Sequence, residues 1–220
     1  MRITSILIVF LSVFHFSFAQ ELKIKYNIIM ESSDPAMQPQ LQMSKGSTLT
    51  VFAKGEQSRV EMKMGQLMTT TTILDVNKKK GLTLMEGMLG KQAATFEGED
   101  FDTYHGEDND AEIEFLDETK TILGHKCKKA IVYIDEEGGE MVFWYTEDVK
   151  ANYAFVGDYS KYGLPGVALE YGVEQESISM KFVATELNTN FKADKNLFDL
   201  NIPAGYTEKS FKEMINMSGQ

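Results

Sequence analysis

TTTTILDVNKKKGLTLM, residues 69–85, is the stretch that decides the fold class. Its first part, residues 69–76, is rich in β-branched side chains, which favour strands. Residues 77–81 form a polar turn, and residues 82–85 return as a second apolar run. A connection this short predicts an antiparallel β-hairpin with a charged tip.

The same strand pattern continues on both sides of this hairpin. Alternation of apolar and polar residues, or apolar runs bounded by turn residues, predicts strands in the following segments: 22–28, 48–53, 59–64, 130–134, 141–145, 167–173 and 177–187. Helical signals are few. Phe211, Met214 and Ile215 indicate a short terminal amphipathic helix, and residues 33–46 and 150–162 are interpreted as loops or short helices.

These segments predict a mainly β fold with a few short helices. The short connections favour a single strongly curved antiparallel sheet, a half-barrel. No break in composition suggests a second domain, so residues 20–220 are predicted to form one domain.

The N-terminus is typical of a secretory signal peptide. One positive charge, Arg2, precedes an apolar run over residues 6–18, and Ser17-Phe18-Ala19 fits a small-x-small cleavage site. The apolar run is shorter than the roughly 20 residues that a membrane-spanning helix needs. We therefore predict a signal peptide over residues 1–19 and a periplasmic or secreted protein that does not span the membrane.

The chain is acidic, with a formal net charge of −11. A protein of this charge repels nucleic acid and anionic membrane surfaces, so we expect no nucleic-acid partner. Cys127 is the only cysteine and cannot form an intramolecular disulfide. The expectation is a monomer held together by an ordinary core and without a cofactor.

Three groups of residues could carry chemistry. Residues 97–118 are rich in Asp and Glu, are expected to begin as a loop, and fit either an irregular Ca²⁺ site or a solvated acidic loop. His125 and Cys127 would share a strand face, but neither a further Cys nor an orienting Asp or Asn accompanies them, so we predict no catalytic or metal site there. The 13 methionines fit a plain core, a ligand-cavity lining or, less readily, a Cu(I) site.

Tyrosines cluster in the sequence around Trp144, the only tryptophan. Amphipathic rings of this kind bind glycans or partners, or form a half-buried β surface. The candidate ligand-binding residues chosen from the methionine and aromatic patterns are Met62, Met64, Trp144, Tyr162 and Leu164.

Several segments of the second half resemble exported bacterial proteins of the GLPGLI family and related domains of unknown function. Residues 119–130, TKTILGHKCKKA, resemble the family strand I-x-G-[YH]-K-C-x-K-A, and residues 144–146 resemble its WYT strand end. Residues 163–166 resemble GLPG, although Val167 and Ala168 replace the usual Leu-Ile, and residues 197–206 are similar to the F-x-L-P-x-G-Y close. The resemblance implies a LolA-like half-barrel, a fold whose carriers bind acyl chains in the concave face. It implies no functional residue, and the GLPG segment itself is interpreted as a hinge that turns the chain into the next strand.

The leading hypothesis is a non-enzymatic envelope protein that binds a lipid or a lipoprotein acyl chain in the concave face. The alternative is a protein-interaction or structural module with a filled core, which predicts an exposed aromatic patch near Trp144 and Tyr162. An enzyme is the third reading, and the sequence contains no phosphate loop, G-x-S-x-G elbow or H-E-x-x-H motif to support it.

Overall fold

The computed structural model describes residues 21–88, 90–105, 112–133, 139–149, 162–175 and 178–218. The predicted signal peptide lies outside these residues. So do residues 106–111 of the acidic stretch and residues 150–161 of the segment interpreted as a loop or short helix.

Twelve strands make up most of the described chain. In chain order they are β1 (Glu21–Ser32), β2 (Thr48–Lys54), β3 (Gln57–Met64), β4 (Met68–Asp75), β5 (Lys80–Gly87), β6 (Gly90–Glu97), β7 (Glu112–Ile122), β8 (His125–Tyr133), β9 (Glu140–Thr146), β10 (Val167–Gln175), β11 (Ile178–Asn188) and β12 (Thr207–Glu208). The helices are short: η1 (Pro35–Met37), α1 (Gln38–Met43), α2 (Glu99–His105) and α3 (Phe211–Ser218). Every strand predicted from sequence is present, as is the terminal helix.

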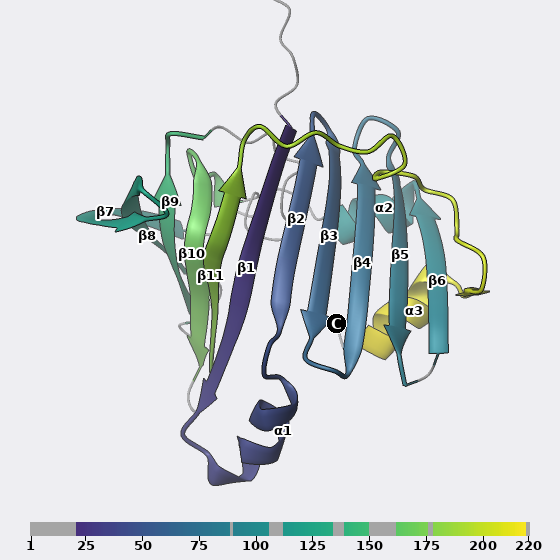
Figure 1. Ribbon diagram of the computed structural model, residues 1–220, viewed down its shortest axis with the longest axis horizontal. Helices are drawn as coiled ribbons and strands as arrows, with labels where there is room; N and C mark the ends of the chain where they lie inside the picture. Colours follow the sequence, from purple (N-terminus) through teal and green to yellow (C-terminus); the bar gives the residue numbers. More distant parts are fainter. Residues whose placement is uncertain are drawn as a thin grey trace, which may run out of the picture.

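The strands form one sheet in the order β12-β6-β5-β4-β3-β2-β1-β11-β10-β9-β8-β7. Neighbouring strands are antiparallel except β12, which pairs parallel with β6. The sheet bends along its length, so that β7 to β9 turn away from the plane of β2 to β5 (Figure 1). The prediction of a mainly β fold built on a single curved sheet is confirmed.

One face of the sheet carries the main core. Strand register aligns Ile24, Val51, Val60, Thr72 and Thr83 across β1 to β5 on this face, which we call the inner face. Over β1, β2 and β8 to β11, the inner face is filled by the protein's own side chains. The rings of Tyr171 and Phe182 stack there at 4.5 Å, and Phe143 stacks on Tyr171 at 5.8 Å.

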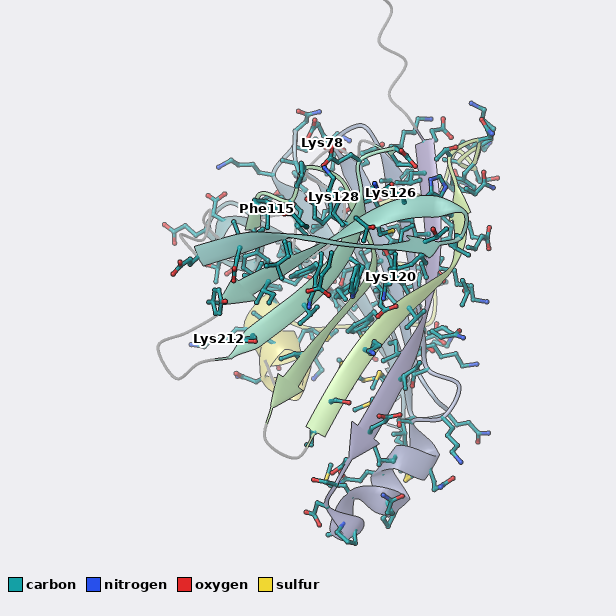
Figure 2. All side chains as sticks on the ribbon, turned by 90° about the vertical axis from the view of Figure 1, so that its left-hand side faces the viewer. Lys78, Phe115, Lys120, Lys126, Lys128 and Lys212 are labelled. Atoms are coloured by element: carbon teal, nitrogen blue, oxygen red, sulfur yellow. The ribbon has the colours of Figure 1, made fainter. Side chains whose placement is uncertain are left out.

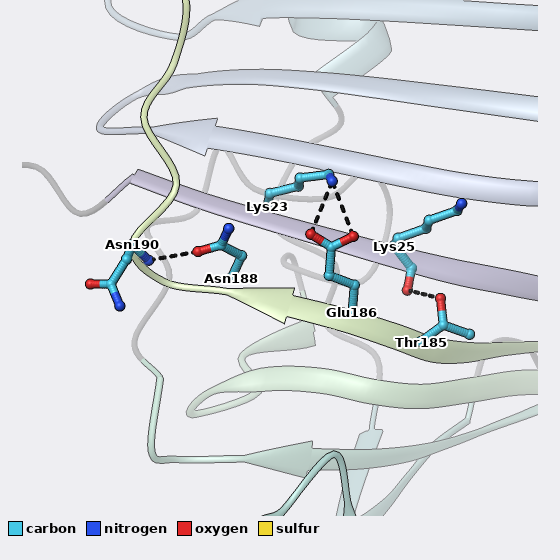
Figure 3. Close-up of polar contacts among 6 residues, drawn as sticks. All are labelled: Lys23, Lys25, Thr185, Glu186, Asn188 and Asn190. Carbon is cyan, nitrogen blue, oxygen red and sulfur yellow. Dashed lines mark hydrogen bonds and ion pairs between the residues drawn. The ribbon is translucent and has the colours of Figure 1, made fainter.

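The two halves of the sheet meet where β1 pairs with β11 (Figure 3). Lys23 Nζ lies 3.0 Å from both carboxylate oxygens of Glu186. Beside this ion pair, Thr185 is an extra residue in β11, because Lys25 pairs with Glu186 and Tyr26 with Ala184. The Thr185 hydroxyl donates a hydrogen bond to the Lys25 carbonyl at 3.1 Å, which anchors the bulge.

The outer face of β4 to β6 is covered by the chain between β11 and β12. Phe198, Leu200, Ile202 and Tyr206 of this segment pack on the buried cluster Ile73, Leu82, Leu84 and Ala93. The phenol of Tyr206 donates a hydrogen bond to the Glu86 carboxylate. Burial and this carboxylate raise the pKa of Tyr206 to about 12.

The GLPG segment turns the chain into β10, as predicted. Gly163 adopts φ +71°, which glycine tolerates best. Leu164 packs against the main core, and Tyr162 lies in it. Gly166 is required for a different reason: a β-carbon there would stand 2.0 Å from the carbonyl oxygen of Thr146.

The acidic stretch differs from the prediction. Residues 97–118 do not begin as a loop, because β6 runs to Glu97 and α2 follows over Glu99–His105. The helix forms because Phe101 and Tyr104, three residues apart, pack on Phe96 while its acidic residues face outward. Among the described residues, no group of three or more His, Cys, Asp or Glu side chains could hold a metal ion.

Candidate functional site

Helices α2 and α3 lie against the inner face of the sheet near its β6 edge (Figure 1). Between these helices and β3 to β5 is a cavity of ≈ 200 Å³. We call it the methionine cavity; its lining consists of Val60, Met62, Met68, Thr70, Thr72, Thr83, Met85, Tyr104, Phe211, Met214 and Ile215.

Strand register explains why methionines surround this cavity. Thr70 on β4 pairs with Met62 on β3 and with Met85 on β5, so the two thioether side chains flank a shorter one on the same face. Met68 stands two residues along β4, on the same face as Thr70. Helix α3 adds Met214. Because the Thr70 side chain is shorter than the methionine side chains around it, space remains above Thr70.

The roof of the cavity is held in place by stacked rings. Phe96 on β6 lies 4.4 Å from the Phe211 ring and 5.1 Å from the Tyr104 ring, measured between centroids. Phe96 itself lies over Gly81, where a β-carbon would stand 2.1 Å from the ring. The absence of a side chain at Gly81 therefore sets the height at which the helices pack on the sheet.

Helix α3 begins with a capping box, Ser210-Phe211-Lys212-Glu213. The Glu213 carboxylate accepts hydrogen bonds from the backbone N–H and the hydroxyl of Ser210, at 2.9 and 2.7 Å. The Glu213 N–H donates to the Ser210 hydroxyl at 3.3 Å. Because the Lys209 N–H also donates to the Ala93 carbonyl at 2.8 Å, the start of the helix is fixed to the sheet edge.

The cavity lining is apolar with a polar floor. None of its described lining residues is charged. Its polar groups are the hydroxyls of Thr70, Thr72 and Thr83 and the Tyr104 phenol, and the Thr72 and Thr83 oxygens lie 3.5 Å apart. Such a lining suits an uncharged apolar ligand and offers a metal ion only thioether and hydroxyl groups.

Of the five residues selected from sequence, only Met62 lines this cavity. Met64 and Leu164 pack against the main core, and Tyr162 lies in that core with 7% of its surface exposed. The prediction of an exposed aromatic patch near Trp144 and Tyr162 is therefore wrong for Tyr162, which is buried. The structure does not bring the five side chains together in one site.

Trp144 lies on the outer face among lysines. The Lys120 ammonium is 4.3 Å from the centroid of its ring, and the Lys129 ammonium is 5.9 Å away. Lys120, labelled in Figure 2, also forms an ion pair with Glu170 at 2.7 Å. The tryptophan thus anchors a cation–π and ion-pair cluster on the sheet surface.

Cys127 and His125 do not form a nucleophilic pair. The thiol is buried, and burial raises the pKa of Cys127, which keeps it protonated. His125 Nδ1 instead lies 3.0 Å from the carboxylate of Asp148.

Two further hollows lie on the other half of the sheet. One, of ≈ 470 Å³, lies beside the β7–β8 hairpin; we call it the hairpin groove, and its lining includes Phe115, Lys126, Lys128, Tyr145 and Pro165. Phe115, Lys126 and Lys128 lie near one another in Figure 2. The other hollow, of ≈ 330 Å³, lies over Gly172 beside Trp144 and Lys181.

The cavity residues that sequence reasoning missed come from three strands and two helices. Met68 and Met85 entered the sequence analysis only among the 13 methionines of the chain, and no signal related them to Met214. The helical spacing of Phe211, Met214 and Ile215 predicted helix α3. It did not predict that the helix packs over β3 to β5 and closes one side of the cavity.

Fold and cavity define a curved-sheet β protein with two short helices packed on its inner face. The chain belongs to the family described as N-glycanase peptide, N-terminal domain, whose profile matches residues 45–158. The resemblance to the GLPGLI family is not confirmed, and the LolA-type likeness stays a prediction. A comparison with curated proteins gives no match.

Solved structures of PNGF-II share the fold. The structure in space group P21 matches at 17% identity and a TM-score of 0.53, covering 91% of this chain and 34% of PNGF-II. The C2 structure matches at 15% identity and a TM-score of 0.51, covering 91% and 33%. The chain therefore spans about one third of the length of PNGF-II. A beta-barrel-like protein of unknown function, DUF1849 from Brucella abortus, matches at 8% identity over 79% of this chain and 99% of its own, but its TM-score of 0.35 supports no inference.

No helix in the described part of the chain has both the length and the apolar composition needed to cross a membrane.

Proposed function

We propose that this chain is an exported, non-enzymatic protein of the cell envelope that binds an apolar ligand in the methionine cavity. One observation carries the proposal: four methionines and two aromatic side chains line a partly open cavity whose described lining is uncharged. Flexible thioethers adapt to apolar molecules of different shape, so the lining suits binding better than catalysis. The N-terminal segment typical of a signal peptide supports a periplasmic or secreted location.

The ligand class follows from the lining. A lipid or a lipoprotein acyl chain would enter with an apolar segment between β3 to β5 and the roof helices. The main core supports this placement, because the other half of the inner face is already filled by side chains such as Phe143 and Tyr171.

Lipid extraction of the full chain, purified from its native compartment and analysed by mass spectrometry, tests the proposal. We expect an apolar molecule in stoichiometric amount, and its loss from a Thr70→Met variant that fills the cavity. A Thr50→Val variant on the outer face is the control. Absence of any apolar molecule, together with failure of added apolar probes to bind, would overturn the proposal.

A second candidate function is a protein-interaction module of the envelope. The hairpin groove favours it, because Phe115 is 51% exposed beside Lys126 and Lys128. Family membership also supports it, since a domain of this fold forms about one third of PNGF-II and is therefore part of a longer chain there.

Substitution of residues that line the hairpin groove tests this second candidate function. Phe115→Ala combined with Lys126→Glu is expected to remove an envelope protein that co-purifies with the wild-type chain. Met88→Ala, at an exposed apolar side chain elsewhere, is the matched control. An unchanged set of co-purifying proteins would exclude this role for the groove.

A further inference from the structure

The size of the methionine cavity restricts its ligand. An engineered protein cavity of about 150 Å³ lined by Leu, Ile and Phe holds one benzene molecule, whereas sites for drug-sized ligands measure roughly 300–1,000 Å³. The methionine cavity, at ≈ 200 Å³, lies close to the first value. It accommodates one ring or a short branched chain, and only the end of a long acyl chain.

Charge restricts the ligand further. A charged group buried without a partner is strongly unfavourable, and the described lining contains neither a Lys or Arg for an anion nor an Asp or Glu for a cation. Fatty-acid carboxylates and ammonium compounds therefore lack a counter-charge inside the cavity. A molecule that lies entirely inside the cavity must therefore be neutral.

The floor adds a polar requirement. The Thr72 and Thr83 hydroxyls share one long contact of 3.5 Å, which leaves hydrogen-bonding capacity on both oxygens. Thr70, between Met62 and Met85, makes no side-chain hydrogen bond within the described part of the chain. A hydroxyl or carbonyl group of a ligand would find partners along this row, while its apolar body lies under Phe211 and Met214.

We infer that the methionine cavity selects a small uncharged molecule with a ring-sized apolar body and one hydroxyl or carbonyl group. This inference rests on the proposed function and narrows its ligand. The methionines contribute adaptable contacts around the ring, and the threonines orient its polar group.

The test uses the full-length exported chain, carrying ¹³C-methyl methionine, and four probes followed by NMR. Phenol has the ring and the hydroxyl and is neutral at pH 7; benzene lacks the hydroxyl; benzoate carries a charge at this pH; and hexadecanol is a long neutral chain. We expect phenol to shift the methyl signals of Met62, Met85 and Met214 in a saturable manner. Benzene should bind roughly threefold to tenfold more weakly, the usual effect of one hydrogen bond, and benzoate more weakly still.

Two isosteric variants locate the polar contact. Thr70→Val removes the hydroxyl at the centre of the floor and should weaken phenol binding roughly threefold to tenfold without altering benzene binding. Thr50→Val, on the outer face of β2, should change neither phenol binding nor benzene binding. Unperturbed methyl signals of Met30 and Met43, which do not line the cavity, show that each variant is folded.

The outcomes separate the two claims. Binding of hexadecanol without binding of phenol or benzene would overturn this inference and leave the proposed function standing. Equal affinity for benzoate and phenol would overturn the requirement for a neutral ligand, and an unchanged affinity of Thr70→Val for phenol would overturn the role of the floor. If none of the four probes shifted the signals of the cavity methyl groups, both this inference and the proposed function would fail.

Discussion

Gly166 lies so close to Thr146 that a β-carbon at residue 166 would stand 2.0 Å from the Thr146 carbonyl oxygen. Thr146 ends β9 and pairs with Val167 at the start of β10. The contact therefore fixes the point at which the GLPG segment joins the sheet, and it depends on the missing side chain.

Alanine substitutions in the GLPG segment should separate two roles of glycine. Gly166→Ala forces the Thr146 backbone away and should lower the free energy of unfolding by roughly 3 kcal/mol or more. Gly163→Ala meets no atom within 4 Å and suffers only from its φ of +71°, so its loss should be about 1–2 kcal/mol. Urea unfolding of both variants measures the difference. Equal losses would mean that the close approach to Thr146 relaxes without cost.

The capping box of α3 should control the roof of the methionine cavity. Ser210→Ala removes the hydroxyl that exchanges hydrogen bonds with Glu213 and should destabilise the helix by about 1 kcal/mol. Hydrogen exchange of the α3 amides should become faster while exchange in β1 and β2 stays unchanged. Lys212→Ala, at an exposed position of the same helix, is the control. Faster exchange throughout the sheet would show that α3 is not a separate unit.

Acid should weaken the turn between β4 and β5 through Asp75. Burial alone raises the pKa of this carboxyl, but hydrogen bonds from Lys78 and Gln57 outweigh it and lower the pKa below its usual value. A carboxyl with a lowered folded-state pKa stabilises the protein above its unfolded-state pKa, about 3.9, and this contribution is lost as the pH falls further. Chemical denaturation at pH 7 and pH 3 should therefore show a smaller acid-induced loss for Asp75→Asn than for the wild type. Asp117→Asn, at an exposed carboxylate in the β7 bulge, is the control variant; identical pH dependence of both variants would refute the assignment.

Cys127 should be inert in the folded protein. Its thiol is buried and its pKa is raised by burial, so both access and the thiolate population are reduced. At pH 8 an aromatic disulfide reagent should react at least about a hundredfold more slowly with the native chain than with the chain in denaturant. A native rate close to the denatured one would contradict the burial.

The fold was predictable because strand pattern is local. The β-branched run of residues 69–76 and the polar turn after it define one hairpin without reference to the rest of the chain. The acidic stretch shows the opposite case. Its helix depends on Phe101 packing against Phe96, a contact that charge composition conceals.

The site was much less predictable. Met62 was selected for its place in a methionine-rich strand, but its partners Met85 and Met214 reach it only through strand register and through a helix more than a hundred residues away. Trp144 drew attention as a rare aromatic, yet Lys120 lies over its ring. Neither relation leaves a periodic signal in the sequence.

The position of β1 has a consequence for the order of folding. This strand lies in the middle of the sheet, with β2 on one side and β11 on the other. The half formed by β1 to β6 consists of consecutive hairpins and can assemble as soon as residues 21–97 are available. The other half joins it only when β11, some 160 residues after β1, becomes available. Until then the free edge of β1 exposes unpaired backbone groups, so we expect the chain to be more prone to aggregation before β11 pairs with β1, and Lys23 with Glu186, than afterwards.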